Sequence, residues 1–174
     1  MDSNQPKDLD YSFSEIRKYA SGVHFLNPGI ESAHISKFEK EFGVILPTAY
    51  KMFLQAYNGG ELFRPGTVLA EINDENTEQR IAGKSYLDEY FLEARQWPGM
   101  PKGYLIIADM NYGDAICIKL VESEVYDSKV IQWDVEGGVV SRSWNGFIEW
   151  LEDCLEEGSM FVNYDGSEKD PDFL

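Results

Sequence analysis

The stretch LPTAYKMFLQAYNGG (residues 46–60) indicates a short helix with a defined start and end. Pro47 has no amide hydrogen, and the first turn of a helix is the place where that loss costs nothing. Large apolar side chains then recur at i, i+3, i+4 and i+7, which places them on one face of the helix: Tyr50, Phe53, Leu54 and Tyr57. Asn58, Gly59 and Gly60 tolerate positive φ, so we expect the helix to end there in a left-handed cap.

This aromatic face is interpreted as part of the protein core. Large apolar residues at helical spacing are the ordinary signal of a buried face, and a ligand-binding box is the less favoured alternative. The stretch from Leu46 to Gly60 is therefore read as scaffold rather than as a site.

The composition is that of a globular domain with a strongly acidic surface. The 174 residues are 43% hydrophobic and 14% aromatic, which fits one domain with a sizeable core. The 31 acidic residues outnumber the 15 basic ones, giving a formal net charge of −16. Such a field repels nucleic acid and anionic lipid and attracts basic partners, although high solubility is the simpler explanation of the charge.

The sequence predicts an intracellular protein that does not cross a membrane. The start MDSNQPKDLD has neither the basic region nor the apolar region of a secretory signal. No apolar stretch approaches the ~20 residues that span a bilayer. Cys117 and Cys154 both lie in apolar surroundings, which argues against a disulfide framework.

The order of predicted elements indicates a single α+β domain with a mainly antiparallel sheet. Helices are expected at 12–20, with Ser12 and Glu15 in a capping box, at 30–42 with Gly43 as the stop, at 84–97 and at 144–155. Strands are expected at 67–72, 104–109, 115–120, 130–135 and 139–143. We expect an N-terminal extension over 1–29, the domain over 30–155 and an acidic, mobile tail over 156–174.

Five segments in this order resemble the SUKH superfamily, which includes bacterial immunity proteins and fungal SMI/KNR-type cell-wall assembly regulators. The segments are FEKEFGVILP, YKMFLQAYNGG, YLIIADMNYGDAICIKL, VIQWDVE and WNGFIEWL, and the similarity covers roughly residues 30–155. The positions that match the family pattern are Glu39, Leu46, Pro47, Tyr50, Phe53, Leu54, Asn58, Gly59, Gly60, Gly113, Asp114, Phe147 and Leu151. Most of these positions are explained by folding.

The resemblance implies a non-catalytic binding protein without a cofactor. Many bacterial members of the superfamily bind a co-encoded toxin, often a nuclease or deaminase, and neutralise it. The resemblance therefore favours an immunity protein in the cytoplasm, with a protein toxin, expected to be basic, as its partner. The alternative is an intracellular regulatory scaffold of the cell-wall-regulator kind.

No catalytic motif supports an enzyme. The sequence lacks a GxSxG elbow, a GxxxxGK[ST] loop, an HExxH pair and a GxGxxG turn. His34 falls among polar helix positions, as an ordinary surface histidine does. Both cysteines lie in apolar runs that should raise the thiol pKa, which disfavours a nucleophile. An acid-dependent hydrolase is a third hypothesis, and no specific residues support it.

One acidic constellation follows from the predicted topology. If the strands at 104–109, 115–120 and 130–135 form an up-down-up meander, one end of the sheet gathers polar side chains: Asp109, Asn111, Asp114, Asp134 and Glu136. The simplest explanation is that Asp, Asn and Gly make good turns. The functional alternatives are a docking patch for a basic toxin surface and, more weakly, a divalent-cation site. Asp74, Glu75 and Glu78 form a second candidate contact.

Overall fold

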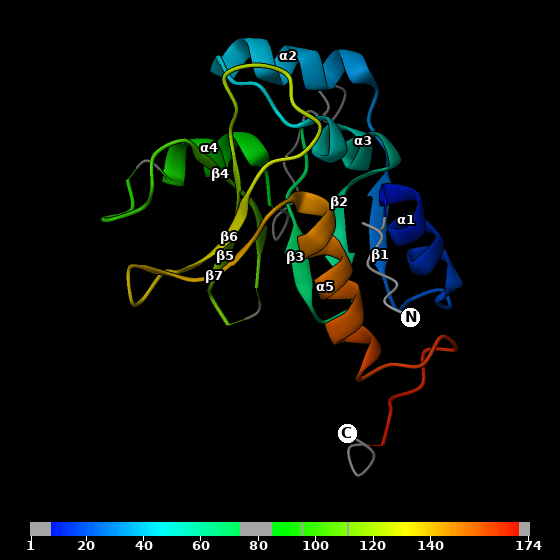
Figure 1. The fold of residues 1–174 in the computed structure, drawn as a ribbon. Helices are drawn as coiled ribbons and strands as arrows, with labels where there is room; N and C mark the ends of the chain where they lie inside the picture. Colours follow the sequence, from blue (N-terminus) through cyan, green and yellow to red (C-terminus); the bar gives the residue numbers. More distant parts are fainter. Residues whose placement is uncertain (1–7, 74–84, 95, 111, 171–174) are drawn as a thin grey trace, which may run out of the picture.

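The fold is a seven-stranded antiparallel sheet with helices packed around it, which confirms the predicted α+β class (Figure 1). The computed structural model describes residues 8–73, 85–94, 96–110 and 112–170. The strands follow one another in chain order, so each strand pairs with its neighbour in sequence. The second candidate contact, Asp74, Glu75 and Glu78, lies outside the described residues, as does Asn111.

The elements of the described chain have the following bounds. The strands are β1 (Phe25–Pro28), β2 (Tyr57–Leu62), β3 (Thr67–Leu69), β4 (Tyr104–Asp109), β5 (Ala115–Lys119), β6 (Val130–Asp134) and β7 (Val139–Trp144). The helices are α1 (Leu9–Lys18), α2 (Ser32–Phe42), α3 (Thr48–Ala56), α4 (Leu87–Ala94) and α5 (Phe147–Ser159).

The centre of the sheet is buried on both faces. All residues from Leu105 to Ala108 in β4 and from Ala115 to Ile118 in β5 are buried. Successive side chains of a strand point to opposite faces, so continuous burial requires a cover on each side. Helix α4 packs on β4, and α5 packs on β7 and α3.

The aromatic face of α3 lies in the core, as predicted. Tyr50, Phe53 and Leu54 are each at most 2% exposed. The Phe53 ring lies 5.3 Å from that of Phe147 and the Tyr50 ring 5.1 Å from it, so α3 and the start of α5 share one aromatic cluster.

The helix begins beside Pro47, as the sequence indicates. Pro47 is the residue immediately before the first helical turn, and its carbonyl accepts a hydrogen bond from the amide of Lys51 at 3.0 Å. The Glu39 carboxylate at the end of α2 accepts a hydrogen bond from the amide of Leu46 at 2.8 Å. This bond joins the two helices through their connection, which gives Glu39 a structural role.

The prediction of a left-handed cap at Asn58-Gly59-Gly60 is wrong, because these residues belong to strand β2. Helix α3 runs directly into the strand at Tyr57, which has extended backbone angles. Gly59 and Gly60 do have positive φ, 75° and 121°. A Cβ atom at Gly59 would lie 2.8 Å from the carbonyl oxygen of Leu69, and one at Gly60 would overlap the carbonyl oxygen of Phe25. The glycines therefore let the neighbouring backbones approach β2 from both sides.

Asn58 extends this pairing with its side chain. Its amide group donates to the carbonyl of Ile72 and accepts from the amide of Ile72, both at 2.9 Å. Its own carbonyl accepts from the side chain of Asn27 at 3.0 Å. Asn58 therefore fastens the segment after β3 to β2, beyond the point where the strand pairing ends.

Helices α1, α2, α4 and α5 each differ from the predicted ranges at one end or at both. Helix α1 begins at Leu9, and the carboxylate of Asp8 caps it by accepting from the amide of Tyr11, while Ser12 lies buried inside the helix. Helix α4 is shorter than predicted, and α5 begins at Phe147 and continues to Ser159. Strand β1 and strand β2 were not predicted, and the strand expected at 67–72 ends at Leu69.

Both ends of the described chain contact the central domain. Helix α1 packs against α5, and β1 pairs with β2, so the segment predicted as an extension contributes to the same fold. After α5 the chain turns back: the carbonyl of Tyr164 accepts from the amide of Ala20 at 2.7 Å, and its ring lies 4.8 Å from that of Tyr19. The sequence analysis did not anticipate these contacts.

Candidate functional site

Strands β4, β5 and β6 form the meander that the sequence predicts. Ala115 at the start of β5 lies opposite Asp109 on one side and Trp133 on the other. The turn after β4 and the end of β6 therefore lie at the same end of the sheet, with Asp109, Asp114, Asp134 and Glu136. The structure brings these residues to one end, but it does not place them all on one face.

A one-residue bulge in β4 separates Asp109 from Asp114. Ile106 lies opposite Cys117, but Ala108 lies opposite Ile116, so one residue of β4 is extra. Without this shift Asp109 would lie opposite Asp114 and share its face. With it, Asp109 lies opposite Ala115. The side chains of Asp109 and Asp114 therefore lie on opposite faces of the sheet, although both residues lie at the predicted end.

Asp109 faces α4. Its carboxylate accepts a long hydrogen bond of 3.5 Å from the hydroxyl of Ser85, and that hydroxyl accepts one of 2.8 Å from Tyr90 in α4. Burial raises the pKa of Asp109 above its ordinary value, and the Ser85 hydrogen bond offsets part of this rise. Asp109 is a half-buried residue under a helix, which makes it a poor first contact for a partner.

Asp114 lies on the other face, the one that α5 covers. Its carboxylate accepts a hydrogen bond of 2.7 Å from the side chain of Gln132, which also donates to the hydroxyl of Tyr112 at 3.3 Å. Gln132 lies opposite Arg142 of β7, and the Arg142 side chain reaches α5. Asp114 is thus held in place by a neighbouring strand at the rim of the sheet.

Asp134 and Glu136 occupy the hairpin between β6 and β7. The Asp134 carboxylate accepts from the amide of Gly137 at 2.7 Å, which is the turn-making role expected of aspartate. Glu136 is exposed. We call Tyr112, Asp114, Asp134 and Glu136 the acidic turn surface. Sequence reasoning missed Tyr112, a residue that is 66% exposed. A large aromatic side chain inside a turn is the signal that could have identified it.

The cysteines and histidines do not form a nucleophilic site. Burial raises the pKa of the Cys117 thiol and of the Cys154 thiol to about 12, which confirms the predicted direction. Both thiols are therefore protonated at neutral pH and are poor nucleophiles. Burial lowers the pKa of His24 to about 4; its Nδ1 atom accepts from the amide of Phe63 at 3.1 Å, a structural contact.

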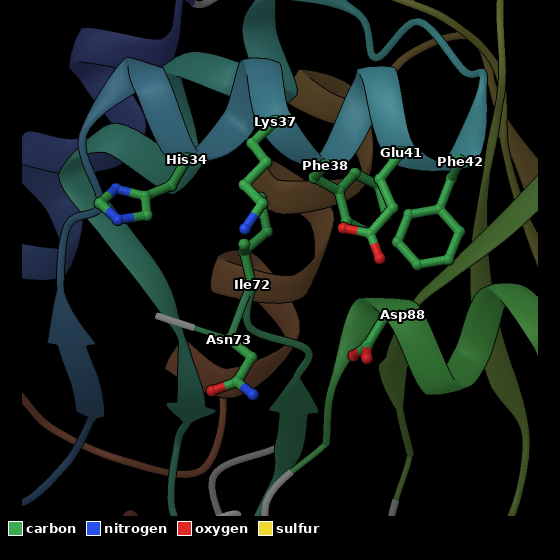
Figure 2. A pocket seen from close by; sticks show the side chains of 8 residues that line it. All are labelled: His34, Lys37, Phe38, Glu41, Phe42, Ile72, Asn73 and Asp88. Atoms are coloured by element: carbon green, nitrogen blue, oxygen red, sulfur yellow. The ribbon is translucent and has the colours of Figure 1, made fainter. Parts of the chain in front are cut away.

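A separate cavity of about 220 Å³ lies between α2 and the start of α4 (Figure 2). Lys37 and Glu41 reach from α2 toward Asn73 and Asp88 on the opposite side. His34 also lines it, so this histidine borders a cavity rather than an open helix surface. The lining carries both signs of charge, so it favours neither an anion nor a cation. Among the described residues, no three His, Cys, Asp or Glu side chains are arranged to hold a metal ion.

Comparison with known proteins agrees with this architecture. The model of the SMI1 / KNR4 family (SUKH-1) matches residues 29–153. The protein belongs to the SMI1 / KNR4 (SUKH-1) family. The match confirms the SUKH resemblance. It begins directly after β1, includes strands β2 to β7, and ends within α5.

A solved structure shares the fold at low sequence identity. The crystal structure of a protein from Pseudomonas syringae pv. tomato superposes with a TM-score of 0.61 and 17% identity. The alignment covers 84% of this chain and 98% of that chain, so the likeness concerns the whole domain. No match was found among curated proteins. None of the helices in the described ranges is long and apolar enough to cross a membrane.

Proposed function

We propose that this protein is a cytoplasmic immunity protein that neutralises a basic protein toxin by binding it directly. The observation that carries the proposal is membership of the SUKH-1 family combined with a net charge of −16. Family members are generally non-catalytic binding proteins. A strongly acidic binder associates fastest with a basic partner, and toxins that act on nucleic acid carry positive charge to neutralise phosphates.

The acidic turn surface is the contact we propose. Tyr112 offers an exposed ring, and aromatic side chains are enriched at the energetic centres of interfaces. Asp114 is held by Gln132 before any partner arrives, so little side-chain freedom is lost when it binds. Asp134 and Glu136 add negative charge from the adjacent hairpin. Asp109 and Asn111 belonged to the same predicted patch; Asp109 lies under α4, and Asn111 is outside the described residues.

The decisive experiment begins with the gene next to that of this protein. An immunity gene should stand beside a gene for a large secreted protein with a variable C-terminal domain. That domain, expressed alone, should arrest growth, and co-expression of this protein should restore it. Failure of rescue, with both proteins expressed and folded, would reject the immunity function.

Association kinetics test the contact. Asp114→Lys combined with Glu136→Lys should slow association on the order of tenfold at low salt and flatten its salt dependence. Glu31→Lys combined with Glu122→Lys makes the same change in net charge at other exposed positions and is the matched control. An equal effect of both pairs would reject the acidic turn surface, while leaving the function itself in place.

The second candidate is an intracellular regulator of the SMI1 / KNR4 kind, because the same family model covers both. A gene neighbourhood without a secreted toxin, together with cell-wall sensitivity after deletion of the gene, favours this alternative. Under either function we expect no turnover of nuclease, esterase or phosphatase substrates by the purified protein. Turnover that disappears in a Cys154→Ser or His34→Ala variant would contradict a non-catalytic binding protein.

A further inference from the structure

Strand β7 forms one edge of the sheet and lacks most of the protection that edges usually carry. Within the described chain it pairs only with β6, and no backbone hydrogen bond joins it to another segment. Its residues from Val139 to Ser143 are exposed. Free N–H and C=O groups along such an edge can pair with a further strand.

The opposite edge is protected in several ways. Strand β1 has four residues, ends in Pro28, and contains a register shift. Proline cannot donate to a ladder, and short irregular strands make poor templates. The guanidinium of Arg64 also lies 5.6 Å from the centre of the Phe25 ring. The two edges of this sheet therefore differ in their capacity to accept a strand.

Arg142, a cationic residue of β7, does not protect the edge of this strand, because its side chain binds to residues of α5. The two terminal nitrogens of Arg142 donate to Asp153 and Glu157, both at 2.6 Å, and its guanidinium lies 4.9 Å from the Trp144 ring. The strand does carry a register shift around Ser141, whose hydroxyl donates to the carbonyl of Gln132 at 3.3 Å. The segment on the hairpin side of this shift is Val139–Val140.

Val139 and Val140 present apolar side chains surrounded by negative charge. They are 54% and 44% exposed, and Val135 in the same hairpin is 40% exposed. Asp134 and Glu136 flank Val135 in the hairpin, and Asp134 lies opposite Val139. Val140 shares a face with Trp133, and Val139 shares the other face with Asp134. An added strand would therefore need apolar side chains on the Val140 face and basic side chains on the face of Val139 and Asp134.

We propose that β7 accepts an extended, basic segment of a protein partner as an eighth strand of the sheet. Main-chain hydrogen bonds would supply affinity, and alternating apolar and lysine or arginine side chains would supply specificity. The proposal rests on the proposed function for the basic character of the partner. A second copy of this chain is disfavoured as the occupant, because two chains of net charge −16 repel each other.

The first test uses a synthetic peptide of alternating lysine and valine and its counterpart with glutamate in place of lysine. At millimolar concentration the lysine peptide should shift the amide NMR signals of β7 and slow their hydrogen exchange. The glutamate peptide should do neither. Shifts confined to other elements, or no shift at all, would overturn the proposal without bearing on the immunity function.

The second test introduces a lysine at one edge of the sheet or at the other and compares the two variants. Val139→Lys places a positive charge on β7, and Phe25→Lys, at a side chain 60% exposed on β1, places the same charge on the other edge. Val139→Lys should weaken binding of the lysine peptide about tenfold or more, since like charges then face each other, and Phe25→Lys should leave it unchanged. Equal effects overturn the proposal. Wild-type dimers in sedimentation that dissociate in Val139→Lys would identify a second copy as the occupant and also overturn it.

Discussion

Replacing Gly59 with alanine tests whether the Asn-Gly-Gly sequence is a strand or a helix cap. In strand β2 the added methyl group would meet the backbone of β3, at 2.8 Å from the carbonyl oxygen of Leu69 and 2.9 Å from that of Ala70. In a left-handed helix cap the same methyl group would point into open space. Gly43 is such a cap, with φ of 63° at the end of α2 and no atom within 4 Å of an added Cβ.

The magnitude follows from two separate contributions. A positive φ angle destabilises a non-glycine residue by about 1–2 kcal/mol. This contribution applies to both substitutions, because φ is 75° at Gly59 and 63° at Gly43. Only Gly59→Ala also pushes a neighbouring backbone aside, which by analogy with overpacked cores costs about 1–3 kcal/mol more. We therefore expect a loss of about 3 kcal/mol for Gly59→Ala, equivalent to about 6–12 °C in Tm for a domain of this size.

Denaturant unfolding and thermal melts of Gly59→Ala and Gly43→Ala measure the difference directly. Hydrogen exchange should also show faster opening of the amides of β2 and β3 in the Gly59 variant, and not in the Gly43 variant. If the two variants lose the same stability, the backbone of β3 does not lie against Gly59 and the strand assignment fails.

Three further predictions concern the core, pH and one helix cap. Phe53→Ala should cost about 3–5 kcal/mol in thermal or denaturant unfolding, because its ring is fully enclosed; an unchanged melt would contradict this. Because burial lowers the pKa of His24 from 6.5 to about 4, the stability from its neutral form is complete above pH 6.5 and is lost as pH falls toward 4. Wild type should then lose about 2 kcal/mol more than His24→Gln between about pH 7 and about pH 4, after allowance for partial exposure of the ring; equal losses in urea titrations would exclude this role. The Asp127 carboxylate accepts from the amides of Phe147 at 2.7 Å and Ile148 at 3.2 Å, so Asp127→Ala should cost about 1–2 kcal/mol, and Asp127→Asn less.

The sequence predicted the parts of the fold whose side chains alternate or recur with a clear period. Strands β4, β5 and β6 are apolar runs bounded by turn residues, and their bounds agree with prediction within one residue. Strands β1 and β2 were missed because they contain Asn, Gly and Pro, which ordinarily interrupt strands. In β2 the glycines allow close approach of backbone segments that are far away in sequence. No local sequence pattern indicates that those segments lie nearby.

The candidate site was predicted in part for a similar reason. Topology alone places the turn after β4 and the hairpin after β6 at one end of the sheet. The face on which Asp109 lies depends on a single extra residue in β4, and that bulge has no signature in the run YLIIAD. The exposed valines of β7 were missed because exposure is a property of the finished fold, whereas Tyr112 could have been identified as a large aromatic side chain inside a turn.

The chain-order arrangement of the strands has a consequence for how the molecule unfolds. When every strand pairs only with its chain neighbours, the sheet resembles a linear array of repeats, which can open from either end one unit at a time. The contact between α1 and α5 joins the beginning of this array to its end (Figure 1). The contact between the two helices connects both ends of the array. Separation of β1 from the sheet and separation of β7 from the sheet therefore become coupled. Loosening this contact should therefore broaden the unfolding transition as well as lower its midpoint.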